Sequence, residues 1–373
     1  MNWTHRWVEA PSTALLILGT MAKKAGHNVK VIHHDIEAIP DNFYADIIGI
    51  TCSTFQVRDA RALAQGYRDL GCKVVIGGAH APVWDGVGET VTGAGEEYWA
   101  DLINGKAEKQ LEIDYSLVDL KRFTGISPLI GAVPSMCMMA SRGCIGQCTF
   151  CNTPVHWGKT ITYSEPQWVV EQIERMHKLY GARELFFQDD TFNINHKWAF
   201  SVFEGIINKG LNKKMVFRLT GRVNQKLVTE EYLKLAKRAG VWNIFYGIES
   251  GSQYMLDRMK KNVTVSEIER AIEMTKKQDI ATVCSFIVGL CGESSDTLME
   301  TNRLINRIQP DHYGWGYACP FPLTEYRNEV VTNKHILNID YGDYIYGMLY
   351  ARTDDLSFED LRRFRGFDYK SPM

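Results

Sequence analysis

The stretch "SRGCIGQCTFCNTPVHW", residues 141–157, contains three cysteines close together. Cys144, Cys148 and Cys151 follow the spacing C-x3-C-x2-C, and His156 lies a few residues further along. Clustered thiols in a chain of this size indicate a metal or redox site rather than a disulfide framework. The stretch also directly follows an apolar run, so its place in the fold decides what the cysteines can do.

Two kinds of metal site are compatible with these residues. Thiolates are soft ligands that suit zinc or iron–sulfur clusters. A structural zinc ion takes four protein ligands, which the three cysteines and His156 could supply, although the spacing differs from the usual pairs of C-x2-C. A four-iron cluster held by three cysteines would leave one iron without a protein ligand, and that iron could bind a substrate or cofactor.

The region around and after the cysteines repeats an apolar run followed by a helical pattern. We expect strands within 135–141, 184–190, 215–222, 243–250, 281–290 and 312–320, and helices within 165–181, 196–210, 229–240, 264–278 and 295–310. Thr264 with Glu267 forms a capping-box pattern, and Thr229 and Ser164 are expected to cap other helices. Six strand–helix repeats predict a partial (β/α)6 barrel, in which the chemistry lies at the carboxyl ends of the strands.

In the first part of the chain, apolar runs and helical patterns also alternate, with a shorter period than in the later region. Helices are expected over 12–27 and 56–71, and strands over 28–34, 45–52 and 72–78, with a fourth short strand within 86–97. This alternation predicts an α/β, doubly wound (Rossmann-like) domain with a parallel sheet. We therefore expect such a domain over 1–110, a linker over 111–131, the barrel over 132–330 and a C-terminal extension over 331–373.

Composition limits the function classes. The chain has 373 residues with a formal net charge of -2, and it carries no long basic run, so we expect no nucleic-acid partner. It has no long apolar stretch, so we expect no membrane span, and the N-terminus is interpreted as part of the fold and not as a signal peptide. Nine cysteines, most in apolar runs, are typical of free thiols in the cytoplasm.

The motif "CIGQCTFC", with an aromatic residue before its last cysteine, resembles the signature of the radical SAM superfamily. Further stretches, "FFQDDTFNIN", "RLTGRVN", "FYGIESGSQYMLDRMKK" and "FIVGLCGES", resemble the branch that has an N-terminal cobalamin-binding domain, and the resemblance covers roughly residues 12–330. It implies a [4Fe-4S] cluster on Cys144, Cys148 and Cys151 whose open iron binds S-adenosylmethionine. One electron from the cluster would break the sulfonium to give methionine and a 5′-deoxyadenosyl radical.

The resemblance also implies further contacts with S-adenosylmethionine. Phe150 would contact the adenine, and the glycine at 289 would let the backbone approach it. Arg222 could pair with the methionine carboxylate, because a guanidinium binds a carboxylate through two hydrogen bonds. The remaining candidates end predicted strands and would bind the amino group, ribose or carboxylate: Gln188, Asp189, Asp190, Glu249 and Ser250. Loop capping and ion pairing are the alternative roles of these residues.

In the first domain the candidates lie where an open α/β sheet binds ligands, at the carboxyl ends of its strands. They are Ser53, Thr54, Gly77, Gly78 and His80, and the resemblance implies that they bind cobalamin. The Asp-x-His-x-x-Gly motif that supplies a histidine ligand in many cobalamin domains is absent. Either cobalamin binds without that histidine, or the domain is vestigial and only shapes the substrate pocket.

These observations predict a radical SAM enzyme that acts on a small molecule, with an electron donor such as flavodoxin or ferredoxin. With cobalamin bound, the expected reaction is methyl transfer to an unactivated carbon or phosphorus. Without cobalamin, a cyclisation or rearrangement becomes the better hypothesis. A non-enzymatic zinc or iron–sulfur binding module is the alternative from another class.

Overall fold

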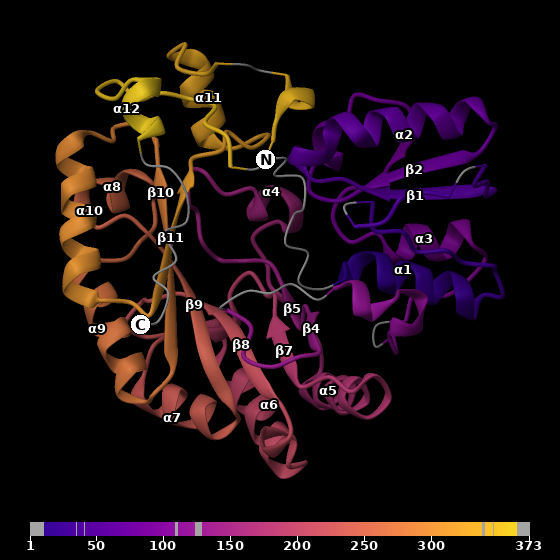
Figure 1. Cartoon of the computed structure of the whole chain (residues 1–373), viewed down its shortest axis with the longest axis horizontal. Coiled ribbons are helices and arrows are strands. Elements are labelled where there is room, and N and C mark those ends of the chain that lie inside the picture. The colour runs from indigo at the N-terminus through magenta and orange to yellow at the C-terminus, as the bar shows by residue number, and fades with distance from the viewer. Residues whose placement is uncertain are drawn as a thin grey trace.

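The computed structural model describes residues 11–34, 36–40, 42–108, 111–123, 129–337, 340–345 and 347–363. Within them the chain forms two α/β units side by side, and a C-terminal segment reaches from the larger unit to the smaller one (Figure 1). The interpretation of the first ten residues as part of the fold concerns residues outside the described ranges. In those ranges, no helix is both apolar enough and long enough for a membrane crossing.

The larger unit is a six-stranded parallel sheet in the order β11-β10-β9-β8-β7-β4. Its strands are β4 Ser135–Met138, β7 Glu184–Phe187, β8 Val216–Gly221, β9 Val241–Glu249, β10 Ala281–Val288 and β11 His312–Tyr317. In the described residues β4 and β11 are the two edges and do not pair, so the barrel is open. Five of the six strands lie within the stretches that the sequence predicts, and β9 begins at Val241, two residues before its predicted stretch.

Helices cover the outer face of this curved sheet (Figure 1). They are α5 Pro166–Tyr180, α6 His196–Asn208, α7 Glu230–Arg238, α8 Gln253–Arg258, α9 Val265–Lys277 and α10 Ser295–Ile308. The capping box of Thr264 and Glu267 is confirmed, as is the cap by Thr229. The cap by Ser164 is wrong: α5 starts one residue later than expected, with Glu165 as N-cap, and the Ser164 carbonyl accepts a hydrogen bond from Trp198 instead.

The smaller unit contains three parallel strands in the order β1-β2-β3: Ile47–Thr51, Lys73–Gly77 and Glu89–Thr90. Helices α1 Thr13–Lys24, α2 Val57–Asp69 and α3 Glu96–Leu102 accompany them. Ile48 packs in the cluster that includes α2, whereas the next residue, Gly49, faces the Trp99 ring of α3. Since neighbouring strand residues point to opposite faces, helices cover this sheet on both faces.

The strand expected over 28–34 is not formed. Val29 and Val31 lie against Gly19 of α1, and His33 ends the segment because its carbonyl accepts hydrogen bonds from two following amides, those of Ile36 and Glu37. The apolar alternation in this segment therefore reflects packing on a helix and not a place in the sheet.

Two segments outside the sheets tie the units together. In the expected linker, Leu111 and Ile113 are buried, and Tyr115 joins the core of the larger unit. The C-terminal segment contains α11 Glu325–Thr332, a short 3-10 turn Tyr341–Asp343 (η7) and α12 Phe358–Arg362. Its apolar residues Leu349, Leu356 and Leu361 pack against Val288 at the end of β10.

Candidate functional site

The three cysteines lie in a loop at the carboxyl end of the larger sheet. We call residues 143–161 the cysteine loop; it begins after β5 Ser141–Arg142, ends before β6 Thr162–Tyr163 and contains the short helix α4 Thr153–Trp157. β5 and β6 pair antiparallel and close the base of the loop. The sequence did not reveal this pair, because two-residue strands leave no periodic pattern.

Asp189, at the end of β7, holds the entrance of the cysteine loop. Its carboxylate is buried and accepts hydrogen bonds from the amide of Ala140, at 3.2 Å, and from both the amide and the hydroxyl of Ser141. Burial raises the pKa of Asp189 to about 7, and the hydrogen bonds from Ser141 and Ala140 oppose that rise. Both carboxylate oxygens of Asp189 therefore hold the backbone that leads into the loop.

Asp190 holds the loop itself. One carboxylate oxygen accepts from the amide of Gly143 at 2.9 Å, and the other accepts from the hydroxyl of Thr153 at 3.0 Å. Gln188, two residues earlier, is exposed at the same strand end. Of the three consecutive candidates, Gln188 is thus the one whose side chain is open to solvent.

Two glycines give the cysteine loop its tight path. Gly143 has φ +104°, and a Cβ there would collide with the carbonyl oxygen of Thr160 across the loop. A Cβ on Gly146 would lie 2.8 Å from the guanidinium of Arg222 and 3.3 Å from the sulfur of Cys144. Glycine is required at position 143, where the obstacle is backbone, whereas a side chain at position 146 would displace the end of Arg222.

The cysteine thiols are partly exposed and close to one another. All three are unpaired and of intermediate burial, unlike Cys52, Cys72, Cys137, Cys284 and Cys291, which are buried. Burial raises the pKa of the Cys151 thiol, which its neighbours Cys148 and Cys144 raise further, while Thr153 opposes the shift. The Cys144 sulfur accepts a hydrogen bond from the Gly146 amide at 3.3 Å.

This donor set fits a cluster with an open iron. Three soft thiol ligands come from one loop, braced by two carboxylates and close enough together to influence one another's ionisation. His156 packs edge-on against Trp157, and burial lowers its pKa. No three His, Cys, Asp or Glu side chains within the described ranges gather as the ligands of a single metal ion.

Arg222 and Glu249 meet through a residue that the sequence did not single out, Lys261. Arg222 donates to the Lys261 carbonyl at 2.6 Å, and the Lys261 ammonium lies 2.8 Å from the Glu249 carboxylate. Both side chains of this ion pair are almost completely buried. The pair satisfies the charge of Glu249, whose backbone has φ +70°. Lys261 could not be found from the sequence, since nothing there pairs it with Glu249.

The remaining three barrel candidates have structural partners. The Ser250 hydroxyl lies 3.2 Å from the hydroxyl of Thr301 on α10. Gly289 donates from its amide to Glu293 and accepts at its carbonyl from the Tyr326 hydroxyl at 2.9 Å. Burial raises the pKa of Glu293 to about 8. Phe150 packs against the main core. The cofactor contacts expected of these residues remain predictions.

The candidates of the smaller unit do come together at the carboxyl edge of its sheet. Ser53 donates from its hydroxyl and its amide to the Gln56 side chain, and Thr54 is buried beside His80. Gly77 ends β2, and Gly78 has φ +93° with no room for a Cβ against the backbone of Cys52. His80 is fully buried, and this burial lowers its pKa to about 4, so its imidazole is neutral at pH 7.

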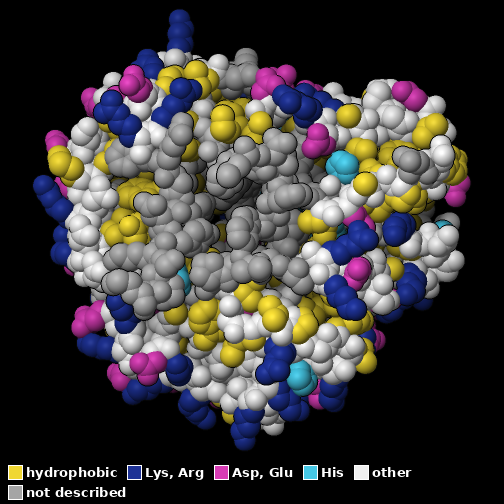
Figure 2. All heavy atoms as spheres, in the orientation of Figure 1, with side chains coloured by type: hydrophobic (Ala, Val, Ile, Leu, Met, Phe, Trp, Pro, Cys, Tyr) yellow, Lys and Arg dark blue, Asp and Glu magenta, His cyan; other side chains and the backbone are white. Residues whose placement is uncertain are grey.

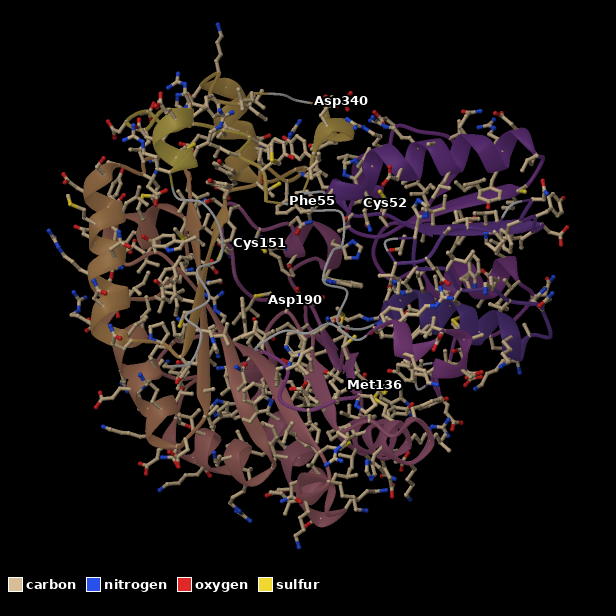
Figure 3. The ribbon with its side chains drawn as sticks, in the orientation of Figure 1. Cys52, Phe55, Met136, Cys151, Asp190 and Asp340 are labelled. Carbon is tan, nitrogen blue, oxygen red and sulfur yellow. The ribbon has the colours of Figure 1, made fainter. Side chains whose placement is uncertain are left out.

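The two carboxyl edges face each other. Figure 3 shows Cys151 and Asp190 on the side of the larger unit that is turned toward Cys52 and Phe55 of the smaller one. Phe55 packs edge-on against Phe321, which follows β11, at 5.6 Å between ring centres. Arg142, beside the cysteine loop, pairs with Glu96 of α3 at 2.6 Å. A ligand between these edges would touch both units.

Among the described residues on the face seen in Figure 2, Lys and Arg side chains are interspersed with Asp and Glu side chains. This mixture accords with the formal net charge of -2.

Comparisons with known proteins find relatives of this chain. The chain is 26% identical over 386 aligned residues to an uncharacterised methyltransferase of Pyrococcus horikoshii, covering 90% of this chain and 81% of the relative. It is 32% identical over 213 residues to the anaerobic magnesium-protoporphyrin IX monomethyl ester cyclase of Cereibacter sphaeroides, covering 57% of this chain but only 34% of that enzyme.

A solved structure shares the fold of both units. The radical S-adenosylmethionine methyltransferase TsrM of Kitasatospora setae, with cobalamin and a [4Fe-4S] cluster bound, superposes with a TM-score of 0.69 at 15% identity. The match covers 88% of this chain and 76% of TsrM, and it confirms the predicted fold class. Residues 138–305, which contain the cysteine loop, match the model of the radical SAM superfamily. This match confirms, over residues 138–305, the resemblance of "CIGQCTFC" to the radical SAM signature.

Proposed function

We propose that this protein is a radical SAM enzyme that transfers a methyl group to a small molecule and uses cobalamin to do so. One observation carries the proposal: the cysteine loop and the Gly77–His80 edge lie at two carboxyl edges that face each other, joined by the Phe55–Phe321 and Arg142–Glu96 contacts. A radical generator and a methyl carrier must both reach the same substrate, and this arrangement suits that need.

The residues have separate tasks in this proposal. Cys144, Cys148 and Cys151 would hold the [4Fe-4S] cluster, which, when bound together with S-adenosylmethionine, supplies the 5′-deoxyadenosyl radical. Asp189 and Asp190 would keep the loop in shape through the hydrogen bonds described above. We infer that Arg222, Gln188 and Phe150 contact S-adenosylmethionine, because they lie on or beside the same loop.

The smaller unit would bind the second cofactor. Ser53, Thr54, Gly77, Gly78 and His80 are the residues that we assign to cobalamin, which, when bound, carries the methyl group. The likeness to TsrM supports this assignment, since that protein is described with cobalamin bound, and with tryptophan as a substrate. We further propose a small-molecule substrate, no nucleic-acid partner and an electron donor of the flavodoxin or ferredoxin class.

The first experiment tests the cluster. The full chain is purified without oxygen, reconstituted with iron and sulfide, and given S-adenosylmethionine and a reductant. We expect about four irons per chain and release of 5′-deoxyadenosine. The Cys148→Ala variant should lose both, whereas Cys72→Ala, which removes a buried thiol of the smaller unit, should keep both. A colourless protein with one zinc and no cleavage would overturn the proposal.

The second experiment tests cobalamin. Hydroxocobalamin is titrated into the reconstituted chain and binding is followed by absorbance. We expect binding in the micromolar range or tighter. Absence of binding together with intact S-adenosylmethionine cleavage would exclude the methyltransferase and favour a cyclisation or rearrangement, the class to which the Cereibacter sphaeroides relative belongs by name.

A further inference from the structure

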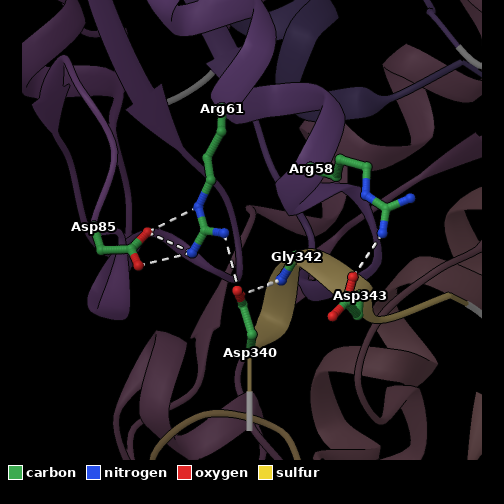
Figure 4. A network of polar contacts seen from close by, with 6 residues as sticks. All are labelled: Arg58, Arg61, Asp85, Asp340, Gly342 and Asp343. Carbon is green, nitrogen blue, oxygen red and sulfur yellow. Dashed lines mark hydrogen bonds and ion pairs between the residues drawn. The ribbon is translucent and has the colours of Figure 1, made fainter. Parts of the chain in front are cut away.

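The short turn at residues 340–344 connects the two units at the edge that we assign to cobalamin. Asp343 pairs with Arg58 of α2 at 2.7 Å, and Asp340 pairs with Arg61 of the same helix at 3.2 Å (Figure 4). Asp340 also accepts from the Gly342 amide and thereby stabilises the turn. These ion pairs attach a segment of the larger unit's C-terminal part to the outer helix of the smaller unit.

A continuous row of rings runs through this turn. Tyr350 stacks on Tyr344 at 4.1 Å, Tyr344 contacts Tyr341 at 5.3 Å, and Tyr341 contacts His80 edge-on at 4.8 Å, all between ring centres. The guanidinium of Arg327, from α11, lies 4.1 Å from the centre of the Tyr341 ring. Tyr341 is therefore held by a cation on the side of the larger unit and touches a histidine of the smaller one.

The row ends on a side chain with unused hydrogen-bonding capacity. His80 Nδ1 lies 3.4 Å from the Thr54 hydroxyl, but Nε2 has no hydrogen-bond partner among the described residues, although His80 is fully buried. A buried polar atom without a partner is costly and calls for an explanation. A ligand at this edge of the sheet would supply the missing partner.

We propose that residues 340–344 form a clasp that fixes the ligand-binding edge of the smaller sheet against the larger unit, and that Tyr341 positions His80 to contact cobalamin. The inference rests on the proposed function, because it names cobalamin as the ligand. Tyr341 is a positioning residue: it acts by holding the His80 ring and excluding water from it.

The state of His80 supports this role. Groups from several elements face it: Thr54 from the turn after β1, Tyr341 from η7, Asp85 from the loop before β3, Arg61 from α2 and Arg327 from α11. Burial is the main cause of its lowered pKa; Arg61 and Arg327 act in the same direction, and Asp85 opposes them. Removal of the Tyr341 ring would admit water and move the pKa of His80 back toward its ordinary value of 6.5.

The test compares Tyr341→Ala with Tyr341→Phe, which keeps the ring contacts. The first readout is the pKa of His80 in the full chain labelled with ¹⁵N-histidine, with the resonance assigned by its loss in His80→Gln. We expect a pKa near 4 in the wild type and in Tyr341→Phe, and a clear rise in Tyr341→Ala. An unchanged pKa in Tyr341→Ala would overturn the positioning role.

The second readout is the affinity for hydroxocobalamin. We expect Tyr341→Ala to weaken binding about tenfold. Tyr341→Phe and the control Tyr44→Ala, which removes an exposed ring of the smaller unit, should stay close to the wild type. Asp343→Asn, which removes one exposed ion pair, should weaken binding less than Tyr341→Ala does. An equal or larger effect of Asp343→Asn would contradict the role of the ring. If the wild type binds no cobalamin, the proposed function fails, while the pKa readout still decides whether Tyr341 positions His80.

Discussion

The carboxylate of Asp189 ties the end of β7 to the backbone that leads into the cysteine loop. The Asp189→Asn variant would turn an amide N–H toward a backbone N–H of Ala140 or Ser141, so at least one buried hydrogen bond would be lost at a cost of about 1–3 kcal/mol. We expect the iron content after reconstitution to fall several-fold while the circular dichroism spectrum stays unchanged. Asp101→Asn, an exposed change on α3, is the control. Normal iron content in Asp189→Asn would contradict the bracing role.

The raised pKa of Asp189 predicts that the stability of the folded chain depends on pH. The pKa of Asp189 lies at about 7 in the folded chain and at 3.8 ordinarily, so the folded state binds the additional proton between these values. Its contribution to the free energy of unfolding is therefore full below about pH 4 and is lost as the pH rises to about 7. Denaturant titrations of the wild type and of Asp189→Asn should show a smaller decline over this range in the variant. Parallel curves would be evidence against the raised pKa.

Lys261 and Glu249 form a buried ion pair. The stability lost on mutation should depend on whether one partner is changed or both. Lys261→Met leaves the buried Glu249 charge without its cation, which we expect to destabilise the chain by about 3 kcal/mol or more. The double variant Glu249→Gln/Lys261→Met should recover much of that loss, because no buried charge then remains. Thermal unfolding measures both. A double variant as unstable as the single one would mean that Lys261 matters for something other than Glu249.

At the scale of elements, the conformation of the cysteine loop depends more on Gly143 than on Gly158. Gly143 and Gly158 both have positive φ, at +104° and +75°, but only Gly143 has a backbone carbonyl where a Cβ would be placed; nothing lies within 4 Å at Gly158. Alanine costs about 1–3 kcal/mol at either position, because both glycines have backbone conformations that other residues rarely adopt. We expect Gly143→Ala to abolish cluster incorporation as well, and Gly158→Ala to keep it. Equal iron content in the two variants would show that the loop can shift to admit the side chain.

The elements also show what the sequence could reveal and what it could not. The barrel strands were predictable, because each is an apolar run bounded by a helical pattern of regular length, as in 281–290 and 295–310. The strand predicted over 28–34 is wrong. Apolar residues that pack on α1 alternate along this segment with the same spacing as in a strand. The pairing of Lys261 with Glu249 and the contact of Tyr341 with His80 join positions that no local pattern connects, and only the folded chain brings them together.

At the scale of the whole molecule, the function requires the two units to keep a fixed relation. The clasp at 340–344 holds them on one side of the facing edges. On another side, Arg142 pairs with Glu96, and the carbonyl of His156 in α4 lies close to Gly93 of the loop before α3. Arg142 also lies over the ring of Trp157. The cysteine loop is thus itself one of the surfaces by which the larger unit contacts the smaller.

A double-mutant cycle on this second contact tests whether it holds the units together. The Arg142 and Glu96 side chains are about three-quarters buried, at 26% and 23% exposure, and we assign the pair about 1 kcal/mol, or roughly fivefold in a local opening equilibrium. Arg142→Gln and Glu96→Gln should each speed hydrogen exchange in α3 and α4 by that factor. The double variant should exchange no faster than either single variant, because one contact has been removed in all three. Additive effects would mean that the two residues act separately, and that the clasp alone keeps the cysteine loop opposite the edge that we assign to cobalamin.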